Sequence, residues 1–288
     1  MDTIRRIGVV GAGLMGSGIA EICARAGLDV LVAETGPNAL AAGRRRVERS
    51  LARGVSSKKL SDADRERALT HVRFTTDLGE FTDRDLVVEA AAETERVKID
   101  VFATLDKVVQ REDAVLASNT SSIPIVKLAM ATARPEQVVG IHFFNPVPVL
   151  PLVELVPSLL TGEQTQRRAE HFVTAVLGKQ VIRSTDRAGF VVNALLIPYL
   201  LSAVRMLESG FASAADIDQA MVLGCAHPMG PLALADLIGL DTTNAIAESM
   251  YAEFKEPLYS PPPLLLRMVE AGLLGKKSGR GFHDYATA

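Results

Sequence analysis

The stretch Ile7–Gly18, which reads IGVVGAGLMGSG, decides the fold of this chain. The apolar run Ile7–Val10 predicts a short strand, and the residues after the glycines, Ser17–Ala26, are typical of a helix with small residues on one face. A strand, a glycine turn and a helix in this order form the phosphate-binding unit of a dinucleotide-binding domain. The turn follows the pattern G-x-G-x-x-G at Gly11, Gly13 and Gly16.

An acidic residue stands where such a domain binds the ribose of its cofactor. Glu34 follows the next apolar run, Asp29–Ala33, and lies 21 residues after Gly13. A carboxylate there accepts hydrogen bonds from both ribose hydroxyls and repels the 2′-phosphate of NADP. Neither Thr35 nor Gly36 supplies a guanidinium for that phosphate. The pattern favours NAD, and the alternative is a glycine turn that binds no ligand.

Further apolar runs alternate with helical patterns through the N-terminal part of the chain. Because each run is continuously apolar, the strands are expected to lie in a parallel sheet that helices cover on both faces. The expected strands are Leu86–Ala91, Ala114–Ala117, Val138–Phe143 and Val153–Val156. The expected helices are Pro37–Val55, Leu60–Leu69 with Ser61 as N-cap, and Glu95–Val109.

From Gly189 onward the patterns are helical, and none predicts a strand. We therefore expect an α/β chain of two domains: a Rossmann-type dinucleotide-binding domain over residues 1–184, then a smaller all-α domain over residues 185–288. The expected helices of the second domain are Asn193–Ser209, Ala214–Val222 with Ser213 as N-cap, Leu232–Ile238, Thr243–Phe254 and a last one that Pro261, Pro262 and Pro263 open and that runs through Ala271.

Composition excludes several classes of protein. The net charge of −3 gives no basic surface for a nucleic acid. No apolar run is long enough for a membrane span, and glycines interrupt the run that a signal peptide would need. Cys23 and Cys225 both lie in apolar contexts, so we expect two buried, reduced cysteines and a cytoplasmic location. No metal site is indicated.

His142 and Glu154 are candidates for acid–base chemistry. His142 ends an expected strand, and strand ends in such sheets face the ligand. Glu154 lies within the apolar run Val153–Val156, where a carboxylate needs a partner. Hydrogen bonded to His142, it would orient the ring for taking a proton from an alcohol. A satisfied buried histidine and an exposed glutamate on an edge strand explain the spacing equally well.

Two further groups of polar residues are placed for substrate binding. The loop Ala117–Ser122, which reads ASNTSS, follows the fourth expected strand. Asn193 lies near the start of an apolar helix, where a polar side chain is unusual unless it has a structural or functional role. A turn rich in Asn, Ser and Thr, and an asparagine that begins a helix, are the structural alternatives.

Several sequence blocks occur in a fixed order along the chain: Gly11–Gly18 (GAGLMGSG), Ser118–Ser122 (SNTSS), His142–Pro148 (HFFNPVP), Leu152–Leu155 (LVEL), Gly189–Asn193 (GFVVN), Pro228–Pro231 (PMGP), Gly239–Thr242 (GLDT) and Gly275–Phe282 (GKKSGRGF). Several blocks in one order are far more specific than any single motif. Through these blocks the chain resembles the 3-hydroxyacyl-CoA dehydrogenase family, above all its bacterial 3-hydroxybutyryl-CoA dehydrogenases, over essentially its whole length. One departure is His283, which replaces an aromatic residue, whereas Tyr285 is kept.

The resemblance implies an NAD-dependent oxidoreductase that interconverts an (S)-3-hydroxyacyl-CoA and a 3-oxoacyl-CoA. It implies that His142 and Glu154 are the acid–base pair, and that Ser121 and Asn193 bind the substrate oxygen. It also implies that Glu93 and Lys98 contact the cofactor near its nicotinamide. The other implied cofactor contacts are Leu14, Met15 and Asn119, together with the three glycines and Glu34.

A CoA ester needs basic residues for its phosphates. Arg53, Lys58 and Lys59 belong to a basic segment that begins at Arg44, and in similar proteins this segment lies near the CoA. A solvated basic face balanced by nearby acidic residues explains the pattern equally well. The apolar helices of the second domain suggest a homodimer through that domain. The rival functions are a dehydrogenase of a free hydroxy acid and a non-enzymatic NAD-binding protein.

Overall fold

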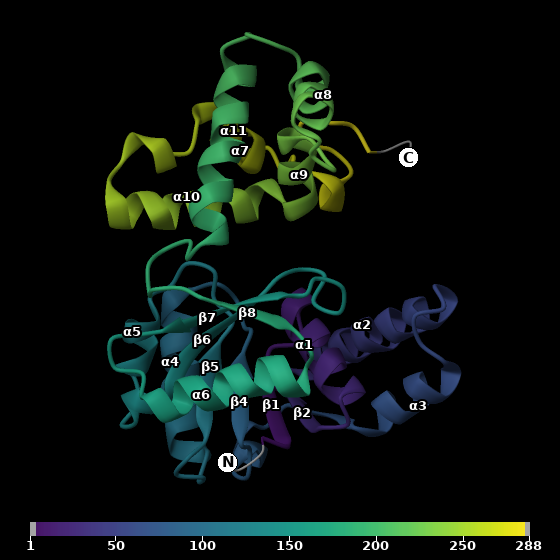
Figure 1. Ribbon diagram of the computed structural model, residues 1–288, viewed down its shortest axis with the longest axis vertical. Helices are drawn as coiled ribbons and strands as arrows, with labels where there is room; N and C mark the ends of the chain where they lie inside the picture. Colours follow the sequence, from purple (N-terminus) through teal and green to yellow (C-terminus); the bar gives the residue numbers. More distant parts are fainter. Residues whose placement is uncertain (1–3, 286–288) are drawn as a thin grey trace. The chain divides into compact units, whose positions relative to one another are not determined.

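The computed structural model describes residues 4–285 of the chain. Two compact units are present, Met1–Asp186 and Arg187–Ala288, so the division lies two residues beyond the expected one. The first unit is a sheet with helices on both faces, and the second is helical (Figure 1). The expected class, a Rossmann-type α/β domain followed by a smaller all-α domain, is confirmed.

An eight-stranded sheet in the order β3-β2-β1-β4-β5-β6-β7-β8 forms the centre of the first unit. All six expected strands are present, and neighbouring strands run parallel except β6 and β7, which are antiparallel. The sheet is therefore mixed, and the expectation of a wholly parallel sheet was wrong. The strands are β1 Arg6–Val10, β2 Asp29–Ala33, β3 Val72–Thr75, β4 Leu86–Glu89, β5 Val115–Ser118, β6 Val138–Phe143, β7 Leu152–Pro157 and β8 Gln180–Arg183.

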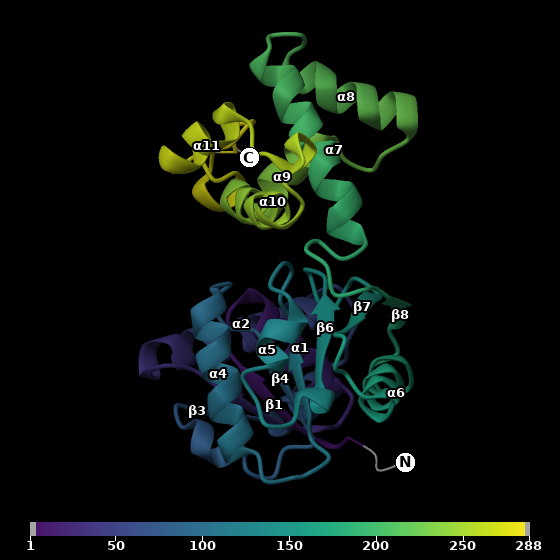
Figure 2. The same ribbon diagram turned by 90° about the vertical axis from the view of Figure 1, so that its left-hand side faces the viewer.

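Helices cover both faces of this sheet, which is why its central strands are buried along their whole length and mostly apolar. Every residue of β4, β5 and β6 is buried. Figure 2 shows α4 and α5 on one side of the sheet and α6 on the other. The helices of this unit are α1 Leu14–Arg25, α2 Pro37–Ser56, α3 Asp62–Thr70, α4 Glu95–Val108, α5 Ile125–Ala129 and α6 Glu163–His171.

The second unit packs its helices around a core that includes Leu200, Leu201 and Met250. Its helices are α7 Val192–Glu208, α8 Ala214–Cys225, α9 Pro231–Ile238, α10 Leu240–Phe254 and α11 Pro263–Glu270. None of the helices that the structure describes is long and apolar enough to cross a membrane. Ser61 and Ser213 are the expected N-caps, since each hydroxyl accepts a hydrogen bond from the first turn of its helix.

The two cysteines are free, but their environments differ. Cys23 is buried in α1, as expected, and burial raises its pKa to about 12. Cys225 is exposed at the end of α8, so the expectation that it is buried was wrong. The helix ends at this residue, and the apolar Leu223 in its last turn is exposed as well, so the apolar neighbours of Cys225 do not bury it.

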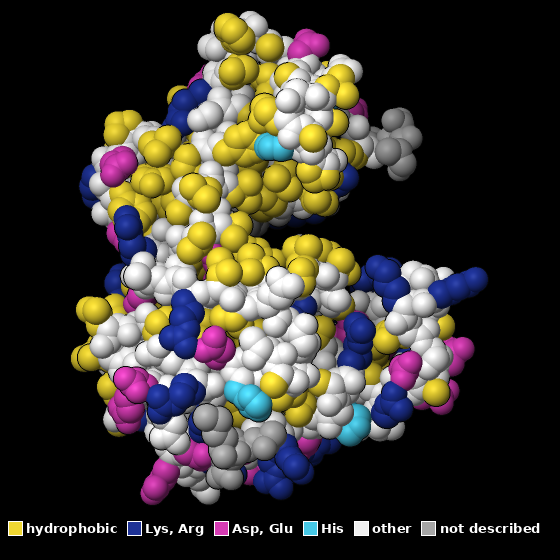
Figure 3. Space-filling model, viewed as in Figure 1, with side chains coloured by type: hydrophobic (Ala, Val, Ile, Leu, Met, Phe, Trp, Pro, Cys, Tyr) yellow, Lys and Arg dark blue, Asp and Glu magenta, His cyan; other side chains and the backbone are white. Residues whose placement is uncertain are grey.

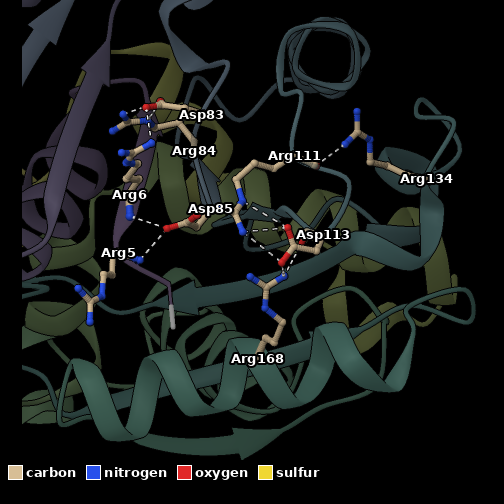
Figure 4. A network of polar contacts seen from close by, with 9 residues as sticks. All are labelled: Arg5, Arg6, Asp83, Arg84, Asp85, Arg111, Asp113, Arg134 and Arg168. Atoms are coloured by element: carbon tan, nitrogen blue, oxygen red, sulfur yellow. Dashed lines mark hydrogen bonds and ion pairs between the residues drawn. The ribbon is translucent and has the colours of Figure 1, made fainter. Parts of the chain in front are cut away.

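Arginine and aspartate side chains form ion pairs and hydrogen bonds at the edge of the sheet where the parallel strands begin (Figure 4). The Asp85 carboxylate accepts hydrogen bonds of 2.8 Å from the backbone N–H groups of Arg5 and Arg6, and it pairs with Arg111 at 3.1 Å. Asp113 pairs with Arg111 and also with Arg168 of α6. These contacts hold the start of β1, the start of β4 and α6 in place.

Candidate active site

The glycine turn between β1 and α1 has the geometry that a bound dinucleotide needs. Gly11 has a φ of +92°, and a Cβ at Gly16 would lie 1.9 Å from the Gly11 carbonyl oxygen, so both positions require glycine. A Cβ at Gly13 would meet nothing within 4 Å, so the space beside this residue is open. Helix α1 starts here without a side-chain cap, which leaves its first N–H groups for phosphate oxygens.

Glu34 directly follows β2 and lies next to this turn. Its carboxylate accepts hydrogen bonds from the backbone N–H of Ala12 at 2.7 Å and of Thr35 at 3.1 Å. The side chain therefore lies against the glycine turn, where the ribose of a dinucleotide binds in this fold. Leu14 is exposed and Met15 half-buried in the first turn of α1, so both flank the same place. These residues together fit NAD.

His142 and Glu154 are direct neighbours in the sheet. Strands β6 and β7 form a hairpin whose register places the two residues opposite each other, on the same face. The His142 Nδ1 lies 2.7 Å from the Glu154 carboxylate, and both side chains are buried. At 3.0 Å, the other ring nitrogen, Nε2, faces the Ser121 hydroxyl. A chain of hydrogen bonds thus runs from Ser121 through His142 to Glu154.

The loop that carries Ser121 is fastened to the residues after β4. The Glu93 carboxylate accepts hydrogen bonds from the Thr120 hydroxyl and from the Ser121 backbone N–H, the second at 2.9 Å, and it pairs with Lys98 at 3.1 Å. Burial alone would raise the pKa of Glu93, but Lys98 and these donors outweigh burial and lower it. Glu93 therefore carries a negative charge that positions the loop.

Glu89 is a residue of this site that sequence reasoning missed. It ends β4, is fully buried, and pairs with the buried Lys98 ammonium at 2.6 Å. Its other oxygen accepts a hydrogen bond from the Ser118 hydroxyl, also at 2.6 Å. The available signal was a charge at the end of a continuous apolar strand, which must have a partner. Glu89 thus joins Lys98 to the loop after β5.

The two asparagines lie in different units. Asn119 is buried beside β6, and its side-chain oxygen accepts a hydrogen bond of 2.9 Å from the Phe143 backbone N–H. This contact links the loop after β5 to the strand that carries His142. Asn193 is buried in the first turn of α7, in the second unit.

The basic segment forms one wall of a cavity of about 380 Å³ in the first unit. Arg46, Arg49 and Arg53 of α2 face α1 and the loop 145–148, which follows β6 directly. Lys58 and Lys59 lie in the turn after α2 and are exposed. Figure 3 shows Lys and Arg side chains gathered over α2 and this turn, at the right of the view. Within residues 4–285, no ion pair joins these arginines to the acidic residues of α3.

A histidine beside a hydroxyl can take the proton of an alcohol, and a dinucleotide turn at the same edge of the sheet is built for a hydride acceptor. The side chains that the structure describes include no cluster of His, Cys, Asp or Glu that could hold a metal ion. Fold and site together define an NAD-dependent dehydrogenase.

Comparison with known proteins agrees with this class of enzyme and places the chain in one family within it. The family described as "3-hydroxyacyl-CoA dehydrogenase, NAD binding domain" matches residues 6–187, and "3-hydroxyacyl-CoA dehydrogenase, C-terminal domain" matches residues 189–285. The chain belongs to the 3-hydroxyacyl-CoA dehydrogenase family, and it is an NAD-dependent enzyme of that family.

Three relatives illustrate how closely the family members agree. A 3-hydroxybutyryl-CoA dehydrogenase of Mycobacterium tuberculosis is 62% identical over 99% of each chain. The crystal structure of M. tuberculosis FadB2 has a TM-score of 0.98 at 62% identity, covering 99% of this chain and 100% of that one. The structure of (S)-3-hydroxybutyryl-CoA dehydrogenase PaaH1 from Ralstonia eutropha has a TM-score of 0.91 at 44% identity, covering 98% and 99%.

Proposed function

We propose that this enzyme interconverts (S)-3-hydroxybutyryl-CoA and acetoacetyl-CoA, with His142 as the group that takes and returns the proton. The hydrogen-bonded chain from Ser121 through His142 to Glu154 carries this proposal. The names of the relatives from M. tuberculosis and R. eutropha support the choice of substrate.

In the oxidation of the alcohol, the proton moves from the substrate hydroxyl to His142. NAD, when bound, supplies the acceptor for the hydride that leaves carbon 3. His142 Nε2 takes the proton of the 3-hydroxyl, and the buried Glu154 carboxylate stabilises the imidazolium that forms. The Ser121 hydroxyl lies within hydrogen-bond distance of the same nitrogen, so it can hold the substrate oxygen as its charge changes. The role of Asn193 stays a prediction from the resemblance.

The CoA part of the substrate is assigned to the cavity between α1 and α2. Arg46, Arg49 and Arg53 supply guanidinium groups, which bind phosphates with paired hydrogen bonds. The loop 145–148 borders the cavity and follows the strand of His142, so an ester bound there can extend toward the base. Lys58 and Lys59 stay candidates for the same phosphates.

The decisive experiment is the loss of NADH absorbance with purified protein and acetoacetyl-CoA, with NADPH in parallel. We expect fast oxidation of NADH and a weak signal with NADPH, because Glu34 repels a 2′-phosphate. Activity on acetoacetate but not on its CoA ester would instead favour a dehydrogenase of free hydroxy acids. Binding of NADH without turnover of any 3-oxo substrate would favour a non-enzymatic binding protein.

We also propose that the second unit forms a homodimer contact. Large apolar side chains are exposed on and beside its helices, at Leu195, Phe211 and Leu223. Sedimentation at micromolar concentration should show a dimer, and a monomer would contradict the proposal. The cytoplasmic location stays a prediction.

A further inference from the structure

Three charged side chains gather at the carboxyl end of β4 and on the helix that follows it: Glu89, Glu93 and Lys98. The Lys98 ammonium lies 2.6 Å from one Glu89 oxygen and 3.1 Å from the Glu93 carboxylate. Glu89 and Lys98 are almost completely buried, whereas the side chain of Glu93 is 36% exposed. We call these three residues the charge triad.

Both acidic members of the triad are carboxylates. Glu89 accepts hydrogen bonds from Lys98, from the Ala91 backbone N–H at 2.7 Å and from the Ser118 hydroxyl at 2.6 Å. An acceptor-only side chain of this kind is the ionised form of a glutamate. Burial acts to raise the pKa of Glu93, but Lys98 and the donors of the loop after β5 lower it overall.

The triad therefore carries a net charge of −1, because two carboxylates share one ammonium. Within residues 4–285, no second cation lies within ion-pair distance of Glu89 or Glu93. Charges with little access to solvent are poorly screened by salt. Since Glu89 already balances the buried Lys98, the excess negative charge belongs to Glu93, the member on the accessible side.

The fold assigns the nicotinamide half of the cofactor to this place. The sheet order puts β2 and β4 on opposite sides of β1, and a dinucleotide lies across the carboxyl ends of the strands at such a switch point. Glu34, directly after β2, is the residue for the adenosine ribose, so the other half lies over the ends of β4 and β5. Ser121, which faces His142, also donates its backbone N–H to Glu93 at 2.9 Å. The triad thus adjoins the place where hydride is transferred.

We propose that the charge triad favours oxidised NAD over NADH, and that the buried Glu89 sets this preference. The oxidised nicotinamide ring is positively charged, and the reduced ring is neutral. The negative charge of the triad attracts the first and not the second. Glu89 acts through Lys98, whose charge it balances, so that the charge of Glu93 stays uncompensated. This inference needs NAD as the cofactor, but it does not depend on the proposed CoA substrate.

The test compares the dissociation constants of NAD and NADH, with no acyl substrate present. Glu89→Gln keeps the size of the side chain, and its amide can accept from Ala91 and Lys98 and donate to Ser118. The triad becomes neutral, so the Kd of NAD divided by that of NADH should rise about threefold to thirtyfold. Titration calorimetry with NAD and the fluorescence of NADH give the two constants. An unchanged ratio would overturn the proposal.

A double variant separates charge from packing. Glu89→Gln combined with Lys98→Met removes one charge of each sign, so Glu93 alone restores the net charge of −1. The ratio of the two constants should then return to within about twofold of the wild type. Contacts that Lys98 makes equally with both forms of the cofactor cancel in this ratio. If the network only shapes the loop after β5, the double variant will stay at the Glu89→Gln ratio or move beyond it, and either result refutes the proposal.

Glu95→Gln is the matched control. Glu95 begins α4, three residues before Lys98, and pairs with Lys127, and both side chains are about half exposed. Solvent screens such a pair, so the ratio should stay within about twofold of the wild type. A control that shifts the ratio as far as Glu89→Gln would show that any nearby carboxylate suffices, and the assignment to the triad would fall.

A further variant covers the case in which Glu89→Gln fails to fold. Glu93→Gln removes the same unit of charge from the partly exposed member, and the ratio should rise at least about threefold. An equal weakening of both forms would mark a purely structural role and refute the proposal. Because no turnover is needed, a shifted ratio supports the triad even if acetoacetyl-CoA is not reduced. An active enzyme whose ratio does not move refutes the triad and leaves the proposed function intact.

Discussion

The two ends of the central sheet use similar charged residues for different purposes. At the end where the parallel strands begin, Asp85 and Asp113 are held by arginines and backbone N–H groups (Figure 4). At the end where they finish, a histidine lies between a serine and a glutamate. A guanidinium stays protonated at any accessible pH, whereas an imidazole can accept a proton and return it during a reaction.

The difference teaches how to separate stability from chemistry in this fold. A network of arginines and carboxylates can orient loops and helices, but no proton can move through it. The Ser121–His142–Glu154 chain contains an imidazole, which can both accept and donate a proton, so it can serve a reaction. Substitutions at the two ends should therefore affect different measurements, and the following predictions are ordered from the largest expected effect to the smallest.

His142→Gln should produce the largest change. Removal of a general base typically lowers turnover by about 10² to 10⁴-fold. We expect kcat for acetoacetyl-CoA reduction to fall within this range while the dissociation constant of NADH, measured by fluorescence, stays the same. His171→Gln, at an exposed position near the end of α6, is the control and should keep wild-type turnover. A His142→Gln enzyme as active as the wild type would sink the catalytic assignment.

Lys98→Met should cost stability at the catalytic end. The substitution leaves the fully buried Glu89 carboxylate without its cation, and breaking a buried pair in this way costs about 3–5 kcal/mol. The free energy of unfolding from urea denaturation measures the loss. Glu89→Gln in the same background should recover part of it, because the orphaned charge is then gone. If the double variant is no more stable than the single one, the pair is not the cause.

Asp85→Asn tests the opposite end of the sheet. The carboxylate accepts two backbone hydrogen bonds and pairs with Arg111, so we expect a loss of about 2 kcal/mol in the free energy of unfolding. Because this end holds no group of the reaction, kcat and KM should stay within twofold of the wild type at temperatures where the variant is folded. A selective fall of kcat would contradict the separation of the two ends.

Glu21, a buried residue of α1, should give the smallest effect, and the test is whether its ionisation raises or lowers folding stability as pH rises. Burial raises its pKa in the folded state, so the unfolded chain releases this proton at a lower pH. Folding stability is therefore reduced as pH rises from the unfolded pKa through the folded one. Glu21→Gln removes this dependence, and its stability relative to the wild type should increase between about pH 4 and pH 8. Urea denaturation at both pH values checks the slope, and an opposite slope would refute the role of burial at this carboxyl.

Several features of the fold could be predicted from local pattern, and others could not. The central strands were found because each is a continuous apolar run. Edge strands β3 and β8 were missed because they are short and largely unburied, so their residues need no apolar pattern. Helices α5 and α6 were also missed. The first has five residues, and the second is strongly polar.

The residues of the candidate site also fall into those that the sequence predicted and those that it did not. His142 and Glu154 could be selected because they are polar residues within apolar runs, and Glu34 because it directly follows one. Ser121 was assigned through the family resemblance. Glu89 could not be given a role, because its partner Lys98 lies on the following helix and only the packing of α4 brings the ammonium to β4.

By itself, the sequence determined the glycine turn, the helix caps and the resemblance to a dehydrogenase family, because these depend on residues within a few positions or on blocks in order. Spacing left open whether His142 and Glu154 meet. The antiparallel register of β6 and β7 decided that question, since it sets the two side chains opposite each other on one face. Register depends on how whole strands pair within the sheet, which is a property of the tertiary structure.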